Sequence, residues 1–472
     1  MSDKNDDRTP DDDDQGQNPF EQMFGMMFGS GGQGFPAAGG QAGGMPLDPS
    51  MLQGMLGQLQ GLLSGGDSSA AAQKVIDQSV PTPDPTISPD LERNSTDAFR
   101  LAELWLERVI DPVAGTGEPR ALNRAAWAKG SLDEWRRLAD PIRKNMSDSM
   151  VENLKEQAPP EMAQLMAGAG QMLSSMSQSM FSVQIGEAVA SLSGAVLSGT
   201  EFGLPLFGTT PVLVEANLPG AAAEMDVDAT QLRIWLATRE LAHLWLFAKY
   251  PWLRGHVETA LAKYASGVEV DLSRVQDLST GTDPAEMQRM AEELRSGMLA
   301  PATTDEQKEA LTTLENLLSV IAGWSDIVVH RACEALEDRD AIREALRGRH
   351  ASESEAEAAF ASHIGFSLRP RRLRDAAALF TFLEQKSGPE ARDAVFDHPD
   401  TLPTTQDLDD PLGYDERRQE TWAADSSLDE ALERILREAD SGDSSRTDEP
   451  HGDDEGRSDE RGDDGLGDSS PR

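Results

Sequence analysis

The chain has 472 residues, a formal net charge of −41 and one cysteine, Cys333. So large an excess of negative charge repels phosphate backbones, which excludes nucleic acid as an expected partner. A single cysteine excludes an intramolecular disulfide and a cysteine-based metal cluster, and it fits a reducing compartment. No leader pattern opens the sequence and no apolar run reaches about 18 residues, so we expect a cytoplasmic protein without a membrane span.

The first 90 residues have the composition of a disordered arm. An acidic block is followed by a stretch rich in Gly, Met and Phe, and residues 81–90 (PTPDPTISPD) have the composition of a proline-rich linker. Met51–Leu63 has apolar residues at helical spacing, but its glycines weaken a helix. We therefore expect a disordered arm and linker over 1–90 and folded structure from about Leu91.

Helical patterns dominate residues 91–425, so the predicted fold class is mainly α. Ser95 or Thr96 is expected to cap the first helix of this domain. Residues 209–218 (TTPVLVEANL) are the best strand candidate, because they are β-branched and bounded by Gly and Pro. Further amphipathic helices are expected over 284–299, 304–337, 353–364 and 368–388.

The end of the sequence contains one more helical pattern. Ser427 and Glu430 have the spacing of a capping box at the start of a short amphipathic helix over 426–440. Its apolar stripe is suited either to docking on the folded domain or to meeting a partner. Residues 441–472 are rich in Asp, Ser and Gly, which predicts a disordered acidic tail.

One predicted helix carries a chemical pattern. It starts at Asp228 or Thr230 and ends near Lys249, because proline follows at 251. Within it, the sequence RELAH over 239–243 differs at one position from H-E-x-x-H. In that motif, two histidines one helical turn apart bind zinc, and the glutamate activates the zinc-bound water.

Arg239 stands where the first histidine of the motif would be. Arginine has no lone pair to offer and is permanently charged, so it cannot bind zinc. On a helix it lies one turn from His243, about where the metal should be. On this spacing alone, an ordinary helix with a partly buried His243 and an ion-paired Arg239 explains the pattern better than a zinc site does.

The surrounding sequence resembles a family. RELAHLWLFAKYPWL (239–253) is similar to the active-helix region of a zincin-like metallopeptidase family found mainly in actinobacteria. The similarity continues in LWLERVIDP, EWRRLADPI, GFSLRPRRLRDAAALF and FDHPDTLPTTQDLDDPLGY, over most of 95–415, and NPFEQMF near the start fits as well. The resemblance implies a zincin-like helical domain, peptide hydrolase activity, a zinc cofactor, and a place for strand 210–215 beside the substrate cleft.

The same resemblance implies which residues form the site. Family members with a full motif take a further zinc ligand from a distal glutamate. Here the distal motif reads IAGW (321–324), so Ala322 stands at the glutamate position and Arg239 at that of the first histidine. Glu240 carries over as the catalytic base and His243 as the remaining metal ligand. The resemblance therefore implies a degenerate site, with zinc absent and hydrolysis lost or altered, in a protein that binds peptide or protein.

Two other functions stay open. The first is an active zinc metallohydrolase with an unorthodox ligand set, for which His256, Glu258 and His330 are the candidates to complete the site. The second is a non-enzymatic scaffold that binds through its arms and the helix over 426–440. Cys333 stands three residues after His330, and we interpret it as a buried structural cysteine rather than as part of a Cys–His pair.

Overall fold

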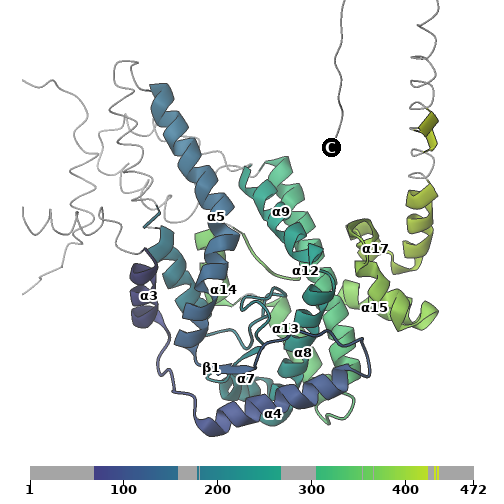
Figure 1. Cartoon of the computed structure of the whole chain (residues 1–472), viewed down its shortest axis with the longest axis horizontal. Coiled ribbons are helices and arrows are strands. Elements are labelled where there is room, and N and C mark those ends of the chain that lie inside the picture. The colour runs from purple at the N-terminus through teal and green to yellow at the C-terminus, as the bar shows by residue number, and fades with distance from the viewer. Residues whose placement is uncertain are drawn as a thin grey trace, which may run out of the picture. The chain divides into compact units, whose positions relative to one another are not determined.

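The computed structural model describes most of the chain between Ser68 and 423, and its fold is mainly helical (Figure 1). The described residues are 68–157, 178–179, 181–266, 304–352, 354–364 and 366–423, with 430, 431, 433 and 434. The expected helix over 284–299 and most of 426–440 lie outside them. The predicted fold class, mainly α with a small strand element, is confirmed. Over these ranges, no helix is long and apolar enough to cross a membrane.

The elements follow one another along the chain with short connections. The helices are α3 (Ser68–Ser79), α4 (Pro89–Leu106), α5 (Arg124–Gln157), α7 (Leu218–Met225), α8 (Ala229–Lys249), α9 (Trp252–Ser266), α12 (Asp305–Ala332), α13 (Arg339–Ala351), α14 (Glu355–Ile364), α15 (Leu373–Ser387), α16 (Pro389–Asp393) and α17 (Thr405–Asp409). Short 3-10 turns are η2 (Ala394–Phe396), η3 (Pro399–Thr401) and η4 (Pro411–Gly413), and a last helix covers 414–423. The strands are β1 (Arg120–Leu122) and β2 (Val212–Val214).

Ordered structure begins before the predicted boundary at Leu91. Helix α3 packs on α5 and buries Ala72 and Ile76 completely. The stretch after it, which has the composition of a linker, is fixed by Arg124, whose guanidinium donates to the carbonyl oxygen of Pro83 at 2.6 Å. The prediction of a disordered segment up to residue 90 is therefore wrong for 68–90, because composition does not show that these few apolar side chains reach a core.

Helix α4 is capped about two turns before the predicted position. Ser88 is the N-cap, and its hydroxyl accepts a hydrogen bond from the first turn. Ser95 and Thr96, the predicted caps, both lie inside the helix. Ser95 is buried and its hydroxyl donates to Glu215, a buried carboxylate that also accepts two hydrogen bonds from Arg233 of α8. A serine stands at 95 because it has an internal partner, not because a helix begins there.

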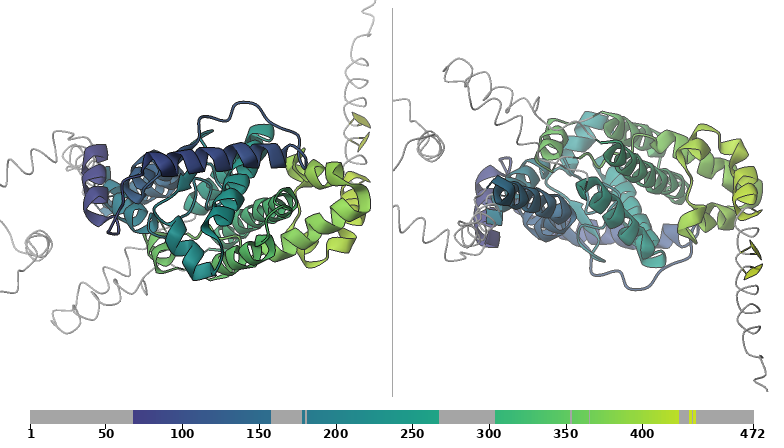
Figure 2. Two further views of the ribbon diagram at one scale, coloured as in Figure 1. Left: turned by 90° about the horizontal axis from the view of Figure 1, so that it is seen from below. Right: turned by 90° about the horizontal axis from the view of Figure 1, so that it is seen from above.

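Helices α8 and α12 pack against each other, and α4 packs across both (Figures 1 and 2). The predicted bounds of α8 are confirmed. Asp228 caps its start by accepting from two backbone N–H groups, and Lys249 is its last residue. Every residue from Trp235 to Phe247 is buried. A helix buried on all sides carries its polar side chains into the interior, where each of them needs a partner.

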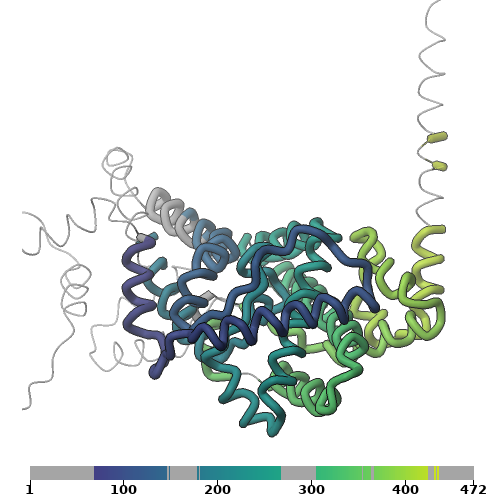
Figure 3. The backbone as a smooth tube through the Cα atoms, turned by 60° about the horizontal axis from the view of Figure 1, so that its bottom comes forward, coloured from purple at the N-terminus to yellow at the C-terminus, as the bar shows by residue number. Residues whose placement is uncertain are grey.

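The two strands form a small parallel sheet. The segment 107–119 doubles back along α4 to reach β1 (Figure 3). Ala121 of β1 then lies opposite Leu213 of β2. With only three residues, β1 is too short to show a strand pattern in the sequence, whereas the strand predicted within 209–218 is confirmed as β2.

Both edges of β2 are hydrogen-bonded. One edge pairs with β1, and on the other Gly199 N donates to Val212 O at 3.0 Å and Val214 N donates to Leu197 O at 2.9 Å. All three side chains of β2 are buried. The resemblance implied that 210–215 borders a substrate cleft. In this fold β2 has no free backbone edge on which an extended peptide could add a strand.

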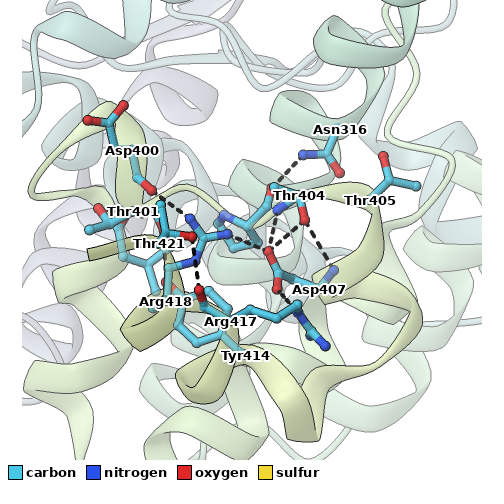
Figure 4. A network of polar contacts seen from close by, with 12 residues as sticks. Asn316, Asp400, Thr401, Thr404, Thr405, Asp407, Tyr414, Arg417, Arg418 and Thr421 are labelled. Atoms are coloured by element: carbon cyan, nitrogen blue, oxygen red, sulfur yellow. Dashed lines mark hydrogen bonds and ion pairs between the residues drawn. The ribbon is translucent and has the colours of Figure 1, made fainter. Parts of the chain in front are cut away.

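The elements from α15 to residue 423 pack together beside α12 (Figure 2). Their polar centre is Asp407, whose carboxylate is fully buried (Figure 4). It accepts from the backbone N–H and the hydroxyl of Thr404, both at 2.7 Å, and from Arg417 and Arg418, both at 2.6 Å. One carboxylate thereby connects α17 to the helix over 414–423.

Candidate functional site

Arg239 lies in the buried middle of α8, with its side chain 10% exposed. Its Nη2 donates to the backbone carbonyl oxygen of Glu201 at 3.1 Å and to Nε2 of His350 at 3.2 Å. Its Nη1 lies 3.9 Å from the carboxylate of Glu201 and has no hydrogen-bond partner among the described residues. A permanent positive charge therefore sits between α8, the segment before β2 and α13.

Two buried imidazole rings accompany this charge. His243 donates from Nδ1 to the backbone oxygen of Arg239 at 2.8 Å, since a carbonyl oxygen can only accept. His350 donates in the same way to the oxygen of Leu346 at 2.7 Å. Each ring therefore has its lone pair on Nε2. Nε2 of His350 accepts from Arg239, whereas Nε2 of His243 is buried and has no partner within the described part of the chain.

The electrostatics keep both rings neutral. Burial, and then the charge of Arg239, lower the pKa of His243 to about 3 and that of His350 to about 4. Burial by itself would raise the pKa of Glu201, but the positive charges of Arg239 and Arg349 outweigh it and lower that pKa. At neutral pH, a guanidinium is thus accompanied by two neutral imidazoles and one carboxylate.

These residues do not fit a zinc ion. A zinc site needs three or four ligands with free lone pairs at about 2.0–2.3 Å. Here the guanidinium of Arg239 already uses the lone pair of His350, and its charge repels a second cation. Across the described ranges, no group of three His, Cys, Asp or Glu side chains is placed to hold a metal. His243 is left as a single imidazole.

The three residues considered for a rebuilt site have other partners. His256 packs edge-on against an indole of its own helix, α9. Glu258 forms an ion pair with Arg137 at 2.7 Å. His330 places Nε2 2.6 Å from Asp340. The structure brings none of them together with Arg239 and His243 in a metal-binding group.

Cys333 is fully buried and its thiol contacts the hydroxyl of Thr238 at 3.5 Å. Burial raises the pKa of this thiol to about 12, so it stays protonated. Its neighbour in sequence, His330, has Asp340 as partner instead. These contacts agree with a buried structural cysteine.

Glu240 uses its carboxylate to hold the backbone around it. Oε2 accepts from the N–H of Thr200 at 2.8 Å and from its hydroxyl at 2.6 Å, and Oε1 accepts from the N–H of Val212 at 3.0 Å. A Cβ at position 199 would lie 2.6 Å from Oε1, so the approach requires Gly199. Burial raises the pKa of Glu240 to about 7. The geometry gives Glu240 a structural role, and its assignment as catalytic base stays a prediction.

The distal motif IAGW has three separate sets of contacts. Ala322 lines a cavity of about 30 Å³ together with Arg239, so the two positions at which the resemblance implies zinc ligands meet at one place. The backbone at Gly323 packs on α15, where an added Cβ would lie 2.5 Å from a side chain. Trp324 donates from Nε1 to Asp393 at 2.7 Å.

Sequence reasoning missed His350 and Glu201. His350 is 111 residues from Arg239 along the chain and lies on α13, a helix that no sequence pattern had indicated. Glu201 lies in the irregular segment before β2. Neither belongs to a recognisable motif, so only the fold shows that they face Arg239.

Comparison with known proteins decides the family. The sequence profile of the zincin-like metallopeptidase family matches residues 67–414, which is more than half of the chain. The chain belongs to the zincin-like metallopeptidase family. This match confirms the resemblance seen in RELAHLWLFAKYPWL and its flanking segments, and it starts next to Ser68, where α3 begins.

One solved structure resembles this zincin-like metallopeptidase. It is a protein from Chloroflexus aurantiacus, described as a "putative hydrolase with a novel fold". The TM-score is 0.50 at 16% sequence identity, and the alignment covers 75% of this chain and 97% of the other. At that identity the likeness shows a shared fold alone. No curated protein matches the chain.

Proposed function

We propose that this zincin-like metallopeptidase carries the guanidinium of Arg239 in place of zinc, has lost peptide hydrolysis, and binds peptide or protein. The observation that carries the proposal is the hydrogen bond from Arg239 to Nε2 of His350. It uses a lone pair of the kind that zinc requires, and it fixes a positive charge beside His243. A side chain bonded in this way is a resident cation that a metal ion would have to displace.

A guanidinium cannot perform the step for which a peptidase needs zinc. Zinc lowers the pKa of a bound water to about 7 and so supplies hydroxide. Arginine has no vacant coordination position, and it only donates hydrogen bonds and positive charge. The carboxylate of Glu240, the family's base, accepts three hydrogen bonds from Thr200 and Val212. This chemistry supports binding of a polar group and not activation of water.

Two cavities beside Arg239 support a binding role. The smaller one, about 30 Å³, is lined by Arg239 and Ala322, and a larger one of about 230 Å³ is lined by Glu201, Arg349 and others. His350 lines both. Because β2 is bonded along both edges, a peptide would enter with a side chain or a terminus rather than as an added strand. A cavity of about 230 Å³ is suited to a side chain.

Metal analysis of the full chain tests the loss of zinc. Protein purified without chelator is expected to hold well below one zinc per chain, and His243→Ala and the control His256→Ala are expected to hold the same trace. Hydrolysis of unfolded casein with added zinc is expected to equal the blank. Stoichiometric zinc in the wild type that disappears in His243→Ala would overturn the proposal and favour an active metallohydrolase.

Peptide binding is tested with matched arginine variants of the full chain. Arg349 lines the cavity of about 230 Å³, whereas Arg374 on α15 is 59% exposed and lines neither cavity described above. Capture of a mixed peptide library is expected to fall in Arg349→Ala and to stay unchanged in Arg374→Ala. Equal capture by both variants and the wild type would contradict binding in the cavity that Arg349 lines.

A further inference from the structure

The smaller cavity, hereafter the Arg239 cavity, lies between α8, α12 and α13. Its polar wall is formed by Arg239, Ser325, Asp326, Arg343, Arg347 and His350. Ala322 leaves the cavity unfilled on the α12 side. Arg239 and Ala322, which stand at the two positions where the family resemblance implies zinc ligands, thus line the same cavity.

The wall of the Arg239 cavity has an excess of positive charge. Arg343 and Arg347 both donate to the carboxylate of Asp326 at 2.6 Å. One negative charge therefore balances only one of these two positive charges. Arg239 adds a third positive charge. Its nearest carboxylate, on Glu201, lies 3.9 Å away and outside the lining. In a chain with a net charge of −41, this local excess favours an anion at this place.

Two polar groups of the wall have no partner. Arg239 is 8% exposed and its Nη1 has no acceptor, and Ser325 is 1% exposed and its hydroxyl has no partner either, within the residues that the structure describes. A buried donor without an acceptor costs free energy, and the cost is larger for a charged group. An anion with two oxygen atoms would satisfy both donors.

The size of the Arg239 cavity selects the class of anion. One water-sized sphere needs about 10–15 Å³, so a cavity of about 30 Å³ has room for about two oxygen atoms. A carboxylate has two oxygens, so one can accept from Nη1 of Arg239, which is the terminal nitrogen without a partner among the residues described, and the other from the hydroxyl of Ser325. A phosphate group, with four oxygens, exceeds this space. A metal cation is excluded by the charge of Arg239.

We propose that the Arg239 cavity binds one carboxylate group, with Nη1 of Arg239 and the hydroxyl of Ser325 as its donors. The inference rests on the proposed function, because it needs Arg239 and not zinc as the resident cation. The carboxylate comes either from the free C-terminus of a peptide or from a small carboxylic acid. Both sources present the same two oxygens to the cavity.

Four probes test the proposal on the full chain at constant ionic strength. Acetate and N-acetyl-trialanine with a free C-terminus are expected to raise the thermal unfolding midpoint. Their neutral counterparts, acetamide and the C-terminally amidated peptide, are expected to leave it unchanged. A peptide acid that acts at lower concentration than acetate identifies a peptide C-terminus, and equal action identifies a small carboxylic acid. If neither acid shifts the midpoint relative to its neutral counterpart, the proposal is wrong.

Two variants on α12 test whether the acids bind in the Arg239 cavity. Ser325→Ala is expected to weaken binding of the acids by about tenfold, because it removes one hydrogen bond to a charged group. Ser319 is a buried serine of the same helix that does not line the Arg239 cavity, and Ser319→Ala is expected to bind as the wild type does. Acid binding that is equal in all three proteins would place the carboxylate elsewhere and overturn the assignment.

A second pair of variants does not depend on added ligand. Ala322→Glu supplies a carboxylate from within the chain, and Ala322→Gln introduces nearly the same volume without charge. The Glu variant is expected to unfold at the higher temperature and to lose its response to acetate. A Glu variant that is no more stable than the Gln variant contradicts an anion site next to Arg239.

The zinc content of the same preparations separates the two proposals. If the protein is zinc-free and neither acid shifts its unfolding midpoint, only the proposed carboxylate site is contradicted. Protein with stoichiometric zinc bound through His243 contradicts the proposed function, whatever the acids do.

Discussion

The guanidinium of Arg239 and the imidazole of His350 are joined by a hydrogen bond of 3.2 Å between α8 and α13. The bond exists only while His350 is neutral, because a protonated ring has no lone pair to accept it. It therefore couples the site to pH, and it connects two helices that both line the cavity beside Ala322.

Supplying the two ligands that the family resemblance implies at 239 and 322 is expected to create zinc binding. In Arg239→His, an imidazole replaces the guanidinium one turn from His243, but Ala322 still supplies no ligand, so only weak zinc binding is expected. Arg239→His combined with Ala322→Glu is expected to bind zinc at least about tenfold more tightly than Arg239→His, as an added or removed ligand partner typically changes affinity by that much or more. Zinc titration with a competing chelator measures this.

The control for that experiment is Arg239→Gln combined with Ala322→Glu. It removes the positive charge and adds the glutamate, but it lacks the first histidine. It is expected to bind zinc no better than the wild type. If Arg239→His combined with Ala322→Glu binds zinc no more tightly than this control, the idea of a zinc pocket that has lost its ligands has no support.

The buried histidines predict loss of stability in mild acid. The folded-state pKa values of His243 and His350 are about 3 and about 4, whereas an unfolded histidine titrates near 6.5. The unfolded state therefore binds more protons below pH 6.5, and stability falls as pH drops from there toward 4. Each histidine contributes about 1.4 kcal/mol per pH unit within that window. Urea unfolding at a series of pH values measures the slope.

Glu240 acts in the opposite direction. Its pKa is raised to about 7, so the folded state binds the additional proton between about pH 7 and 4.5 and gains stability as pH falls. Two histidines outweigh one carboxyl, and a net loss is expected. His243→Gln combined with His350→Gln is expected to reverse the slope between pH 6.5 and 5. An unchanged slope in this variant would show that other groups cause the acid sensitivity.

Gly323 is expected to be required for packing. A Cβ there would lie 2.5 Å from Ala376 Cβ and 2.7 Å from the backbone of Ala377 on α15. Gly323→Ala is therefore expected to destabilise the protein by about 1–3 kcal/mol, as overpacking does, although alanine favours helix. The matched control is Gly348→Ala on α13, where a Cβ meets nothing within 4 Å and a gain of up to about 1 kcal/mol is expected. Chemical denaturation compares the two, and a stabilising Gly323→Ala would contradict the close packing of α12 on α15.

Asp407 is expected to stabilise the C-terminal part of the fold. Burial would raise its pKa, but hydrogen bonds from Thr404, Arg417 and Arg418 outweigh burial and lower it. Its contribution is present above the ordinary aspartate value of 3.8 and is lost as pH falls below it. Asp407→Asn leaves two arginines without their carboxylate and is expected to cost about 3 kcal/mol at pH 7.

The control for Asp407 is Asp409→Asn. Asp409 is 66% exposed and pairs with Arg372, so its replacement is expected to cost at most about 1 kcal/mol. Thermal unfolding at pH 7 compares the two variants. Equal and small losses would show that the buried network of Figure 4 does not stabilise the fold.

Local signals in the sequence predicted local structure. Helix α8 was predicted from its cap at Asp228 and from the proline at 251, and both act within one turn of the helix end. Strand β2 was predicted because a short run of β-branched residues between turn residues favours a strand over a helix. By contrast, Ser95 is a residue type that commonly caps helices, but it lies inside α4. Its role is shown only by its contact with Glu215, 120 residues away.

The candidate site was predictable only in part, for the same reason. Arg239, Glu240, His243 and Ala322 carry a family pattern along the chain. The surroundings of the guanidinium depend on which helices pack against α8, and no periodicity in one segment contains that information. His350 was therefore left without a role, and the three hydrogen bonds that occupy Glu240 were not foreseen.

The contacts of the proline-rich segment determine how the chain can be shortened. Asp84 accepts hydrogen bonds from the first backbone N–H groups of α5, at Arg124 and Ala125, and thereby caps that helix from outside. A protease that cut between Val80 and Ser88 would separate α3 from the body and disturb this cap at the same time. A truncated protein that starts at Leu91 would lose Ile76 from its interior, and α5 would keep only the cap from Asn123, whose side chain accepts from Ala126 N at 3.0 Å. The shortest version with an intact core has to start at or before Ser68.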